Sequence, residues 1–253
     1  WLRAHGADPL HFGPFNMRNA EWFHMLNDDI ISMPDKWEYP WYASWDLAFH
    51  TLALSIVDIE FAKHQLELML TGRYLHPNGQ VPAYEWNFSD VNPPVHAWAT
   101  LFMHRAASLP GYRGIDFLKA AFSKLSLNFT WWVNRKDCRG NNLLQGGFLG
   151  TDSFGVFDRS VPLPGGGYLE QTDGTAWMAF FAQSMAELAT EIAAYDATYQ
   201  DMAAKFLEHF LFIAAALNAP GDAGMWDEED GFYYDRLRLP DGSAVRLKVR
   251  SVV

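Results

Sequence analysis

Aromatic residues surround acidic ones at two places in the first hundred residues, and this pattern indicates a site for sugars. The first group lies at 37–50 and the second at 82–94. Indole and phenol rings pack against the C–H faces of a pyranose, and carboxylates accept hydrogen bonds from its hydroxyl groups. The residues that we expect to bind a saccharide in these stretches are Trp41, Tyr42, Trp45, Asp46, Tyr84, Glu85, Trp86 and Asp90.

Each stretch has two interpretations on sequence alone. Asp46 stands where helical periodicity begins, so it is either a helix cap that accepts backbone N–H bonds or the acid at the floor of an aromatic-walled pocket. One side chain can serve both purposes. The stretch 82–94 belongs to a long loop, 72–94. This is either an ordinary structured loop or, since long ordered loops tend to be functional, part of a binding site.

Carboxylate chemistry is what these residues offer. Hydrolysis of a glycosidic bond needs one carboxylic acid to protonate the leaving oxygen and a second carboxylate as base or nucleophile. The loop acids with aromatic neighbours are Asp46, Glu85, Asp90, Asp152, Asp173 and the cluster 227–230. Spacing along the chain does not determine which two of them face each other.

Other kinds of active site find little support. No His-x-x-x-His or His-Glu-x-x-His pattern occurs, so we predict no metal site, although the acidic loop 227–230 has the ligand types that Ca²⁺ prefers. No Gly-x-Ser-x-Gly motif is present, and the glycines at 165–167 lack a phosphate-loop lysine. The single cysteine, Cys138, excludes an internal disulfide. We expect no cofactor.

The amino-acid composition argues against several kinds of binding partner. The formal charge of −11 argues against a nucleic-acid partner and against an anionic membrane surface. The chain has no apolar run of membrane-span length and no signal peptide, so we expect a cytoplasmic protein. The sequence does not determine the oligomeric state. Because Trp1 is no natural start and the chain stops at Val253 without a terminating signal, we expect a fragment of something longer.

The elements that must position these acids are mainly helices. Helical periodicity predicts about seven, at 19–31, two within 46–71 separated at Asp58, and at 95–109, 115–134, 173–194 and 197–217. Short turns alternate with long loops, so one end of the bundle should collect the acidic, aromatic loops. A β-hairpin is expected from 225–235, with a second turn at 240–242. No strand–helix alternation occurs, which argues against a doubly wound sheet.

Several stretches resemble a known family. They are Trp45-Asp46-Leu47-Ala48-Phe49-His50, Asn128-Phe129-Thr130-Trp131-Trp132-Val133-Asn134 and Trp226-Asp227-Glu228-Glu229-Asp230-Gly231. The run 19–253 resembles the prokaryotic branch of glycoside hydrolase family 63, whose relatives include trehalases and the mannosylglycerate and glucosylglycerate hydrolases. The resemblance implies an all-α fold, an (α/α)6 toroid, inverting hydrolysis of an α-glycosidic bond, and no obligatory cofactor.

The resemblance also implies roles. Asp46 would hold sugar hydroxyls at the subsite preceding the scissile bond, and the best counterpart of the general acid is Asp152, with Asp173 as the rival that also lies close to the site. The match around Asp152 is partial, since Phe148 replaces the family's leading glutamate and its second serine has no counterpart. Nothing before Val253 fits the general base. Residues 1–253 are therefore expected to be the N-terminal portion of a catalytic domain whose ring is incomplete.

Three functions follow as hypotheses. The first is an inverting glycosidase that acts on an α-glucoside or on a mannosyl- or glucosyl-glycerate. The second is an (α/α)6 sugar epimerase or isomerase, which would work through paired histidines and would need His50 or His96 to face another histidine across the cleft. The third is a non-catalytic carbohydrate-binding module.

Overall fold

The computed structural model describes residues 19–33, 35, 37–107, 114–137, 139–145, 159 and 163–250. Within these residues the α-helices are α1 (Ser44–Leu54), α2 (Ile59–Leu68), α3 (His96–Ala106), α4 (Ile115–Lys136), α5 (Thr172–Ala193) and α6 (Gln200–Leu217). The strands are β1 (Tyr168–Glu170), β2 (Trp226–Asp227), β3 (Phe232–Tyr233), β4 (Asp235–Arg238) and β5 (Ala244–Leu247). Short 3₁₀-helices span Pro164–Gly166, Ala197–Tyr199 and Gly221–Ala223.

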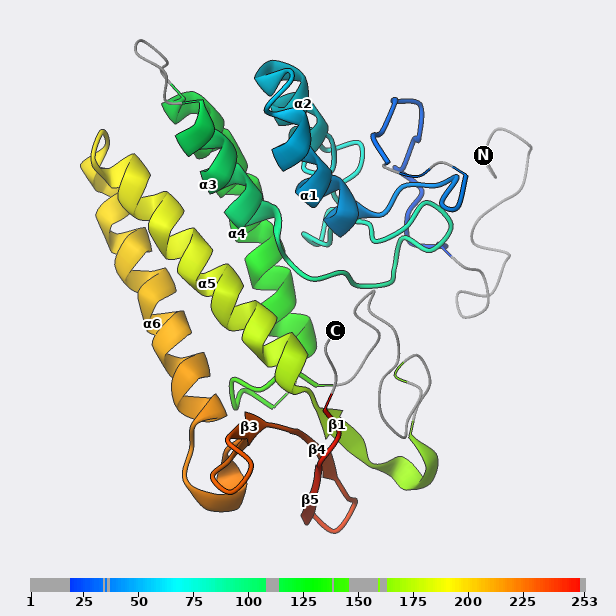
Figure 1. Ribbon diagram of the computed structural model, residues 1–253, viewed down its shortest axis with the longest axis vertical. Coiled ribbons are helices and arrows are strands. Elements are labelled where there is room, and N and C mark those ends of the chain that lie inside the picture. Colours follow the sequence, from blue (N-terminus) through cyan, green and yellow to red (C-terminus); the bar gives the residue numbers. More distant parts are fainter. Residues whose placement is uncertain are drawn as a thin grey trace.

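The six helices form two layers of an arc. α1, α3 and α5 run in the same direction side by side, α3 packing against both of the others (Figure 1). The helices α2, α4 and α6 run back in the opposite direction, and each packs against its neighbours in the chain. Parallel inner helices joined through antiparallel outer ones are the arrangement expected of an α/α toroid. The N-terminal ends of the inner helices therefore lie toward the same side of the arc, as the sequence predicted for the long loops.

Periodic apolar residues fill the space between the layers. Leu118, Leu125 and Trp132 of α4 and Phe181 and Leu188 of α5 are each buried at helical spacing. Phe129 of α4 meets Phe181 of α5 and Phe206 of α6 edge to face, which is a geometry that aromatic pairs prefer. This packing fixes the depth and direction of the inner helices, and with them the residues at their N-terminal ends.

Asp58 caps α2, as its position between two helical runs predicted. Its Oδ1 accepts hydrogen bonds from the backbone N–H groups of Glu60, at 3.1 Å, and Phe61, at 3.0 Å. Replacing Asp58 with alanine is expected to lower the free energy of unfolding by about 1 kcal/mol, because two helix-end donors lose their acceptor. Urea denaturation measures this loss. Asp58→Asn, which keeps a cap oxygen, is the control, and an equal loss in both variants would contradict the capping role.

The strands near the C-terminus form two small antiparallel sheets. β2 pairs with β3, and β4 pairs with β5 across the turn at 240–242, where Gly242 has a φ of 86°. Both expected turns are therefore present. β1, which the sequence did not predict, adds to β4 and completes a sheet of order β1-β4-β5. This sheet ties the segment before α5 to the C-terminal region.

The helix predicted at 19–31 is wrong. The segment has turns and irregular backbone, and Phe23, Leu26 and Ile30 are exposed while Trp22 is buried. Gln65 of α2 stabilises the non-helical backbone of this segment. Its side chain accepts a hydrogen bond from the N–H of Ser32 and donates one to the carbonyl of Ile30. Tertiary hydrogen bonds replace the helical ones here.

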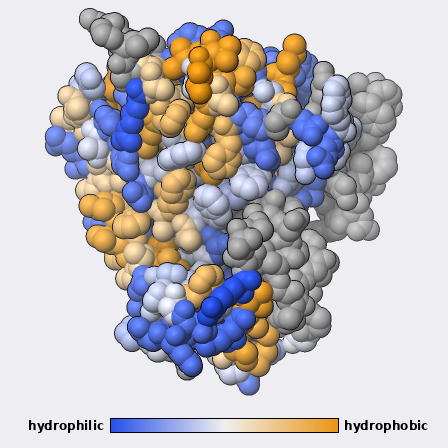
Figure 2. All heavy atoms as spheres, viewed as in Figure 1, coloured by the Kyte–Doolittle hydropathy of each residue, from blue (hydrophilic) through white to orange (hydrophobic). Residues whose placement is uncertain are grey.

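Apolar surface remains on the helical part of the molecule. Figure 2 shows hydrophobic side chains (orange) gathered over the helices, while the end that carries the sheets is mainly hydrophilic. The exposed aromatics include Phe49 of α1 and Phe102 of α3. None of the described helices is long and apolar enough to span a membrane.

Candidate functional site

A polar cluster forms around Tyr84 where α1 and α3 begin. Tyr84 bridges to Ala43 just before α1, and the N–H of Ser44 donates to the carbonyl of Ala83 at 2.9 Å. These backbone contacts bring the phenol beside Trp45 and the carboxylate of Asp46, while the end of the loop supplies Asp90 and Asn92. The structure thus gathers four of the predicted residues, Trp45, Asp46, Tyr84 and Asp90, and adds Asn92.

Burial determines the protonation of this cluster. It is the main reason that the pKa of Tyr84 is raised to about 12, and the charges of Asp46 and Asp90 act in the same direction. The phenol is therefore a permanent hydrogen-bond donor near neutral pH. Burial also raises the pKa of Asp46, while nearby His50 lowers it. A half-buried carboxylate beside a phenol donor and an indole is suited to holding hydroxyl groups.

Asp46 is not a helix cap. The N-cap of α1 is Ala43, which makes no side-chain capping bond, and Asp46 lies within the first turn. The helix begins earlier than its apolar periodicity indicated, because the contact between Ser44 and Ala83 starts it. The carboxylate still lies at the positive end of the helix dipole.

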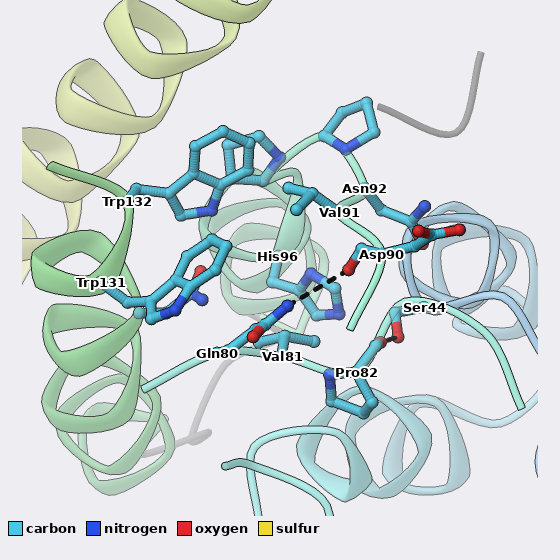
Figure 3. Close-up of a pocket in the computed structure, with 13 residues that line it drawn as sticks. Ser44, Gln80, Val81, Pro82, Asp90, Val91, Asn92, His96, Trp131 and Trp132 are labelled. Atoms are coloured by element: carbon cyan, nitrogen blue, oxygen red, sulfur yellow. Dashed lines mark hydrogen bonds between the residues drawn. The ribbon is translucent and has the colours of Figure 1, made fainter. Parts of the chain in front are cut away.

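A small cavity lies behind the cluster, and one of its lining residues, Gln80, holds the loop in position. Figure 3 shows Gln80 reaching across it to the backbone of Asp90, with His96 near its centre and the side chains of Asp90 and Asn92 directed away from Trp131. Gln80 Nε2 donates to the carbonyls of Ser89 and Asp90, at 3.0 and 3.3 Å. The cavity measures about 20 Å³, room for a single water but not for a sugar.

His96 is a core residue of this cavity. It is 5% exposed, and burial lowers its pKa to about 4, so that it is neutral near pH 7. His50 faces another way, with Nδ1 3.4 Å from the carbonyl oxygen of Ser32. Among the described lining residues of the cavity His96 is the one histidine. The histidine pair that an epimerase hypothesis requires is therefore absent from the described part of this cavity.

Asp173 lies in the first turn of α5 and is held by a buried arginine. Arg159 donates to Asp173 Oδ2 at 2.5 Å and to Asp235 Oδ2 at 2.8 Å, and the N–H of Gly174 donates to Asp173 Oδ1. Both oxygens of Asp173 thus act as acceptors. Asp235 also accepts from the N–H of Thr172, while burial raises its pKa and Arg159 opposes the change. Sequence reasoning missed Arg159 and Asp235, because nothing local links them to Asp173.

The remaining predicted residues lie elsewhere. Trp41, Tyr42 and Glu85 line a different pocket. Trp86 is exposed at the turn of the loop. Asp152 lies outside the described residues. Four of the predicted saccharide-binding residues therefore belong to the cluster around Tyr84 and three to a different pocket, while Trp86 belongs to neither.

The acidic loop 227–230 is occupied by basic side chains and not arranged for Ca²⁺. Asp227 pairs with Arg246 and Lys248, at 3.0 and 3.1 Å, and Asp230 pairs with Lys248 and Arg250, both at 2.9 Å. The backbone N–H of Asp230, together with the bonds from Lys248 and Arg246, lowers the pKa of Asp227 to about 2. Among the described residues no group of three or more potential ligands could hold a metal ion.

Comparison with known proteins finds a similar domain over part of the chain. Residues 39–146 match the family model of the mannosylglycerate hydrolase MGH1-like glycoside hydrolase domain, a segment that contains the whole cluster around Tyr84. Over these residues the chain is similar to a glycoside hydrolase domain, and the resemblance predicted from the sequence is confirmed.

Particular relatives are similar over most of the chain. An uncharacterized protein of Saccharomyces cerevisiae, YMR196W, is 50% identical over 252 residues, which cover 94% of this chain and 23% of that protein. An uncharacterized conserved protein from Thermus thermophilus has a similar fold, with a TM-score of 0.64, 16% identity, and coverage of 87% of this chain and 64% of that one.

Two further structures from Thermus thermophilus are of a family 63 mannosylglycerate hydrolase. The complex with Tris and D-glycerate has a TM-score of 0.59 and 15% sequence identity, and the match covers 67% of that chain. The complex with glucose has a TM-score of 0.59 and 17% sequence identity, and the match covers 65% of that chain. Each comparison covers 87% of this chain. These similarities confirm the partial α/α toroid. The chain spans about a quarter of the yeast relative and about two thirds of the bacterial ones.

Proposed function

We propose that this chain contributes the saccharide-binding half of an inverting glycosidase that cleaves an α-glycosidic bond. The substrate class is a small glycoside, either an α-glucoside or a mannosyl- or glucosyl-glycerate. The observation that carries the proposal is the cluster of Trp45, Asp46, Tyr84, Asp90 and Asn92 at the start of two inner helices. It lies within the segment that matches a glycoside hydrolase domain.

Each member of the cluster has a role in holding a pyranose. Trp45 packs against a C–H face of the ring. The carboxylates of Asp46 and Asp90 accept hydrogen bonds from sugar hydroxyls, and Tyr84 donates one, since its phenol stays protonated. Charge-assisted bonds of this kind, formed where water is partly excluded, are the strong ones. The sugar is thereby fixed while the bond to its neighbour is broken.

Asp152 is the proposed general acid, and Asp173 is proposed to orient the sugar. A general acid must carry the proton that it donates to the leaving oxygen. Both oxygens of Asp173 already accept bonds, one of them from buried Arg159, and this arrangement favours an acceptor role. Because Asp173 stands in the first turn of α5, it faces the same side of the arc as Asp46.

The general base is proposed to lie in further helices of the same toroid, for which residues 1–253 supply the N-terminal part. Three helix pairs make half of a ring of six. The inner helices leave an aromatic row uncovered, with Phe49 next to Trp98, and Trp98 next to Phe102 and Phe180. Additional inner helices would cover this row, which is favourable because it removes apolar surface from water.

Replacing Asp46 with asparagine in the complete protein is expected to lower kcat/KM by about 10- to 150-fold. The loss corresponds to a hydrogen bond between a charged group and a sugar hydroxyl, worth about 1.5–3 kcal/mol. Hydrolysis of mannosyl- and glucosyl-glycerate followed by NMR, which also reports the anomer first released, is the measurement.

The matched control is Asp201→Asn, which changes an acid in the first turn of an outer helix, α6. Unchanged kcat/KM for Asp46→Asn would remove the cluster from the site. A β-configured first product from an α-glycoside supports inversion. Deuterium exchange at a sugar carbon would instead indicate an epimerase, and saturable binding without turnover would indicate a binding module.

A further inference from the structure

A second aromatic pocket lies beside the cluster around Tyr84 and shares none of the cluster's residues. It has a volume of about 500 Å³, within the range of small-molecule sites. Residues within 27–33 and 39–42 supply most of its wall and Glu85 the rest. The side chains that give it its chemistry are Asn27, Asp29, Tyr39, Trp41, Tyr42 and Glu85.

The backbone explains why Glu85 belongs here and Tyr84 does not. The N–H of Glu85 donates to the carbonyl of Tyr42 at 3.3 Å, and Tyr84 bridges to Ala43. Side chains alternate sides along such a pair. Tyr84 is thus directed to the start of α1, and Glu85 joins Tyr42 on the other side.

The side chain of Tyr42 carries a buried hydroxyl group that is not hydrogen-bonded within the described residues. The residue is 3% exposed, and its hydroxyl has no hydrogen-bond partner among the described residues. Burying an unpaired hydroxyl costs free energy, so its presence calls for a partner. Burial and the charge of Glu85 both raise the pKa of Tyr42, so the hydroxyl stays protonated and can donate or accept.

The other walls restrict the ligand. Asp29 is fixed at the edge by Tyr74, whose hydroxyl donates at 2.9 Å, and by Arg73 at 3.1 Å. Tyr39 and Trp41 meet edge to face with ring centroids 5.8 Å apart, and both residues line the pocket. Two carboxylates disfavour an anion. Hydroxyl donors on a ring with C–H faces satisfy both the acids and the aromatic walls.

We propose that this pocket is a second saccharide site, which binds one neutral sugar unit through Trp41, Tyr42 and Glu85 independently of the cluster around Tyr84. This second site is additional to the proposed hydrolysis, and sugar binding there does not depend on hydrolysis. A sugar held here would keep a longer or branched glycoside near the cluster, or anchor the protein to such a ligand.

The test uses D-glucose as probe and fluorine NMR of the protein labelled with 5-fluorotryptophan. The Trp41 signal, assigned with Trp41→Phe, should shift saturably with glucose. Glu85→Gln and Tyr42→Phe should each weaken this binding by about tenfold, the loss expected for a hydrogen bond to a ligand. Tyr42→Phe should not lower the melting temperature, because the hydroxyl has no partner without ligand. If Tyr42 were only structural, Tyr42→Phe would lower the melting temperature and leave the affinity for glucose unchanged.

Asp46→Asn separates this inference from the proposed function. It should reduce hydrolysis and leave the glucose response of Trp41 unchanged. A Trp41 signal that does not move at the highest soluble glucose concentration, or an affinity that survives both Glu85→Gln and Tyr42→Phe, overturns the second site while leaving the hydrolase proposal intact. A Trp41 response lost in Asp46→Asn would show a single shared site.

Discussion

Asp152→Asn in the complete protein is expected to lower kcat on an ordinary α-glycoside by about 10²–10⁴-fold, the contribution of a general acid. Asparagine is similar in shape but has no proton to give the leaving oxygen. Saccharide affinity should change little, because the cluster around Tyr84 is untouched. The measurement is the steady-state rate as a function of pH, in which the variant should lose the fall in rate on the alkaline side.

The leaving group provides a sharp control. The leaving group of a glycosyl fluoride is fluoride, which needs little protonation. Asp152→Asn should therefore lose far less activity on this substrate than on an alkyl glycoside. Asp173→Asn should reduce both substrates alike, since that carboxylate is proposed to orient the sugar. If Asp152→Asn stays active and Asp173→Asn shows the difference between the leaving groups, the acid is Asp173.

Glu170→Ala is expected to lower the free energy of unfolding by about 3–5 kcal/mol, as for other broken buried ion pairs. Glu170 is fully buried, and it accepts from Arg236 at 2.6 Å, from Arg238 at 3.1 Å and from Asn141 at 3.3 Å. Alanine would leave the buried guanidinium of Arg236 without its carboxylate. Because β1 leads directly into α5, hydrogen exchange should also accelerate at the start of that helix.

Urea unfolding measures the effect, and two variants test its cause. Glu187→Ala breaks an exposed ion pair with Arg105 and should change stability little. The double variant Glu170→Met with Arg236→Met should be more stable than Glu170→Ala, since no charge remains buried alone. A double variant as unstable as the single one would mean that packing, and not charge, is what Glu170 supplies.

The helical scaffold was predictable from local pattern. The apolar repeats at 115–134 and 173–194 gave helices that differ from α4 and α5 by two residues or fewer at each end, because burying one face of each is the only way to cover those side chains. Asp58 and the turn at 240–242 were equally local, since a cap and a tight turn depend on a few consecutive residues. The same holds for the resemblance to family 63, which rests on short motifs.

Spacing alone could not place the acids. Tyr84 and Glu85 are neighbours in the chain, yet the bridge between Ala43 and Tyr84 sends them to different pockets. Asp173 acquires its acceptor character from Arg159, a residue that no periodicity connects to it.

The sequence by itself determined most of the helical segments and the end that carries the long loops, and it predicted carboxylate chemistry on sugars. Only the tertiary structure decided that 19–31 is not a helix, that Asp46 is not a cap, and that the predicted residues do not form a single group. The physical reason is the range of the forces involved. Helix periodicity and turns are local, whereas hydrogen bonds such as Gln65 to Ile30 join residues far apart in the chain.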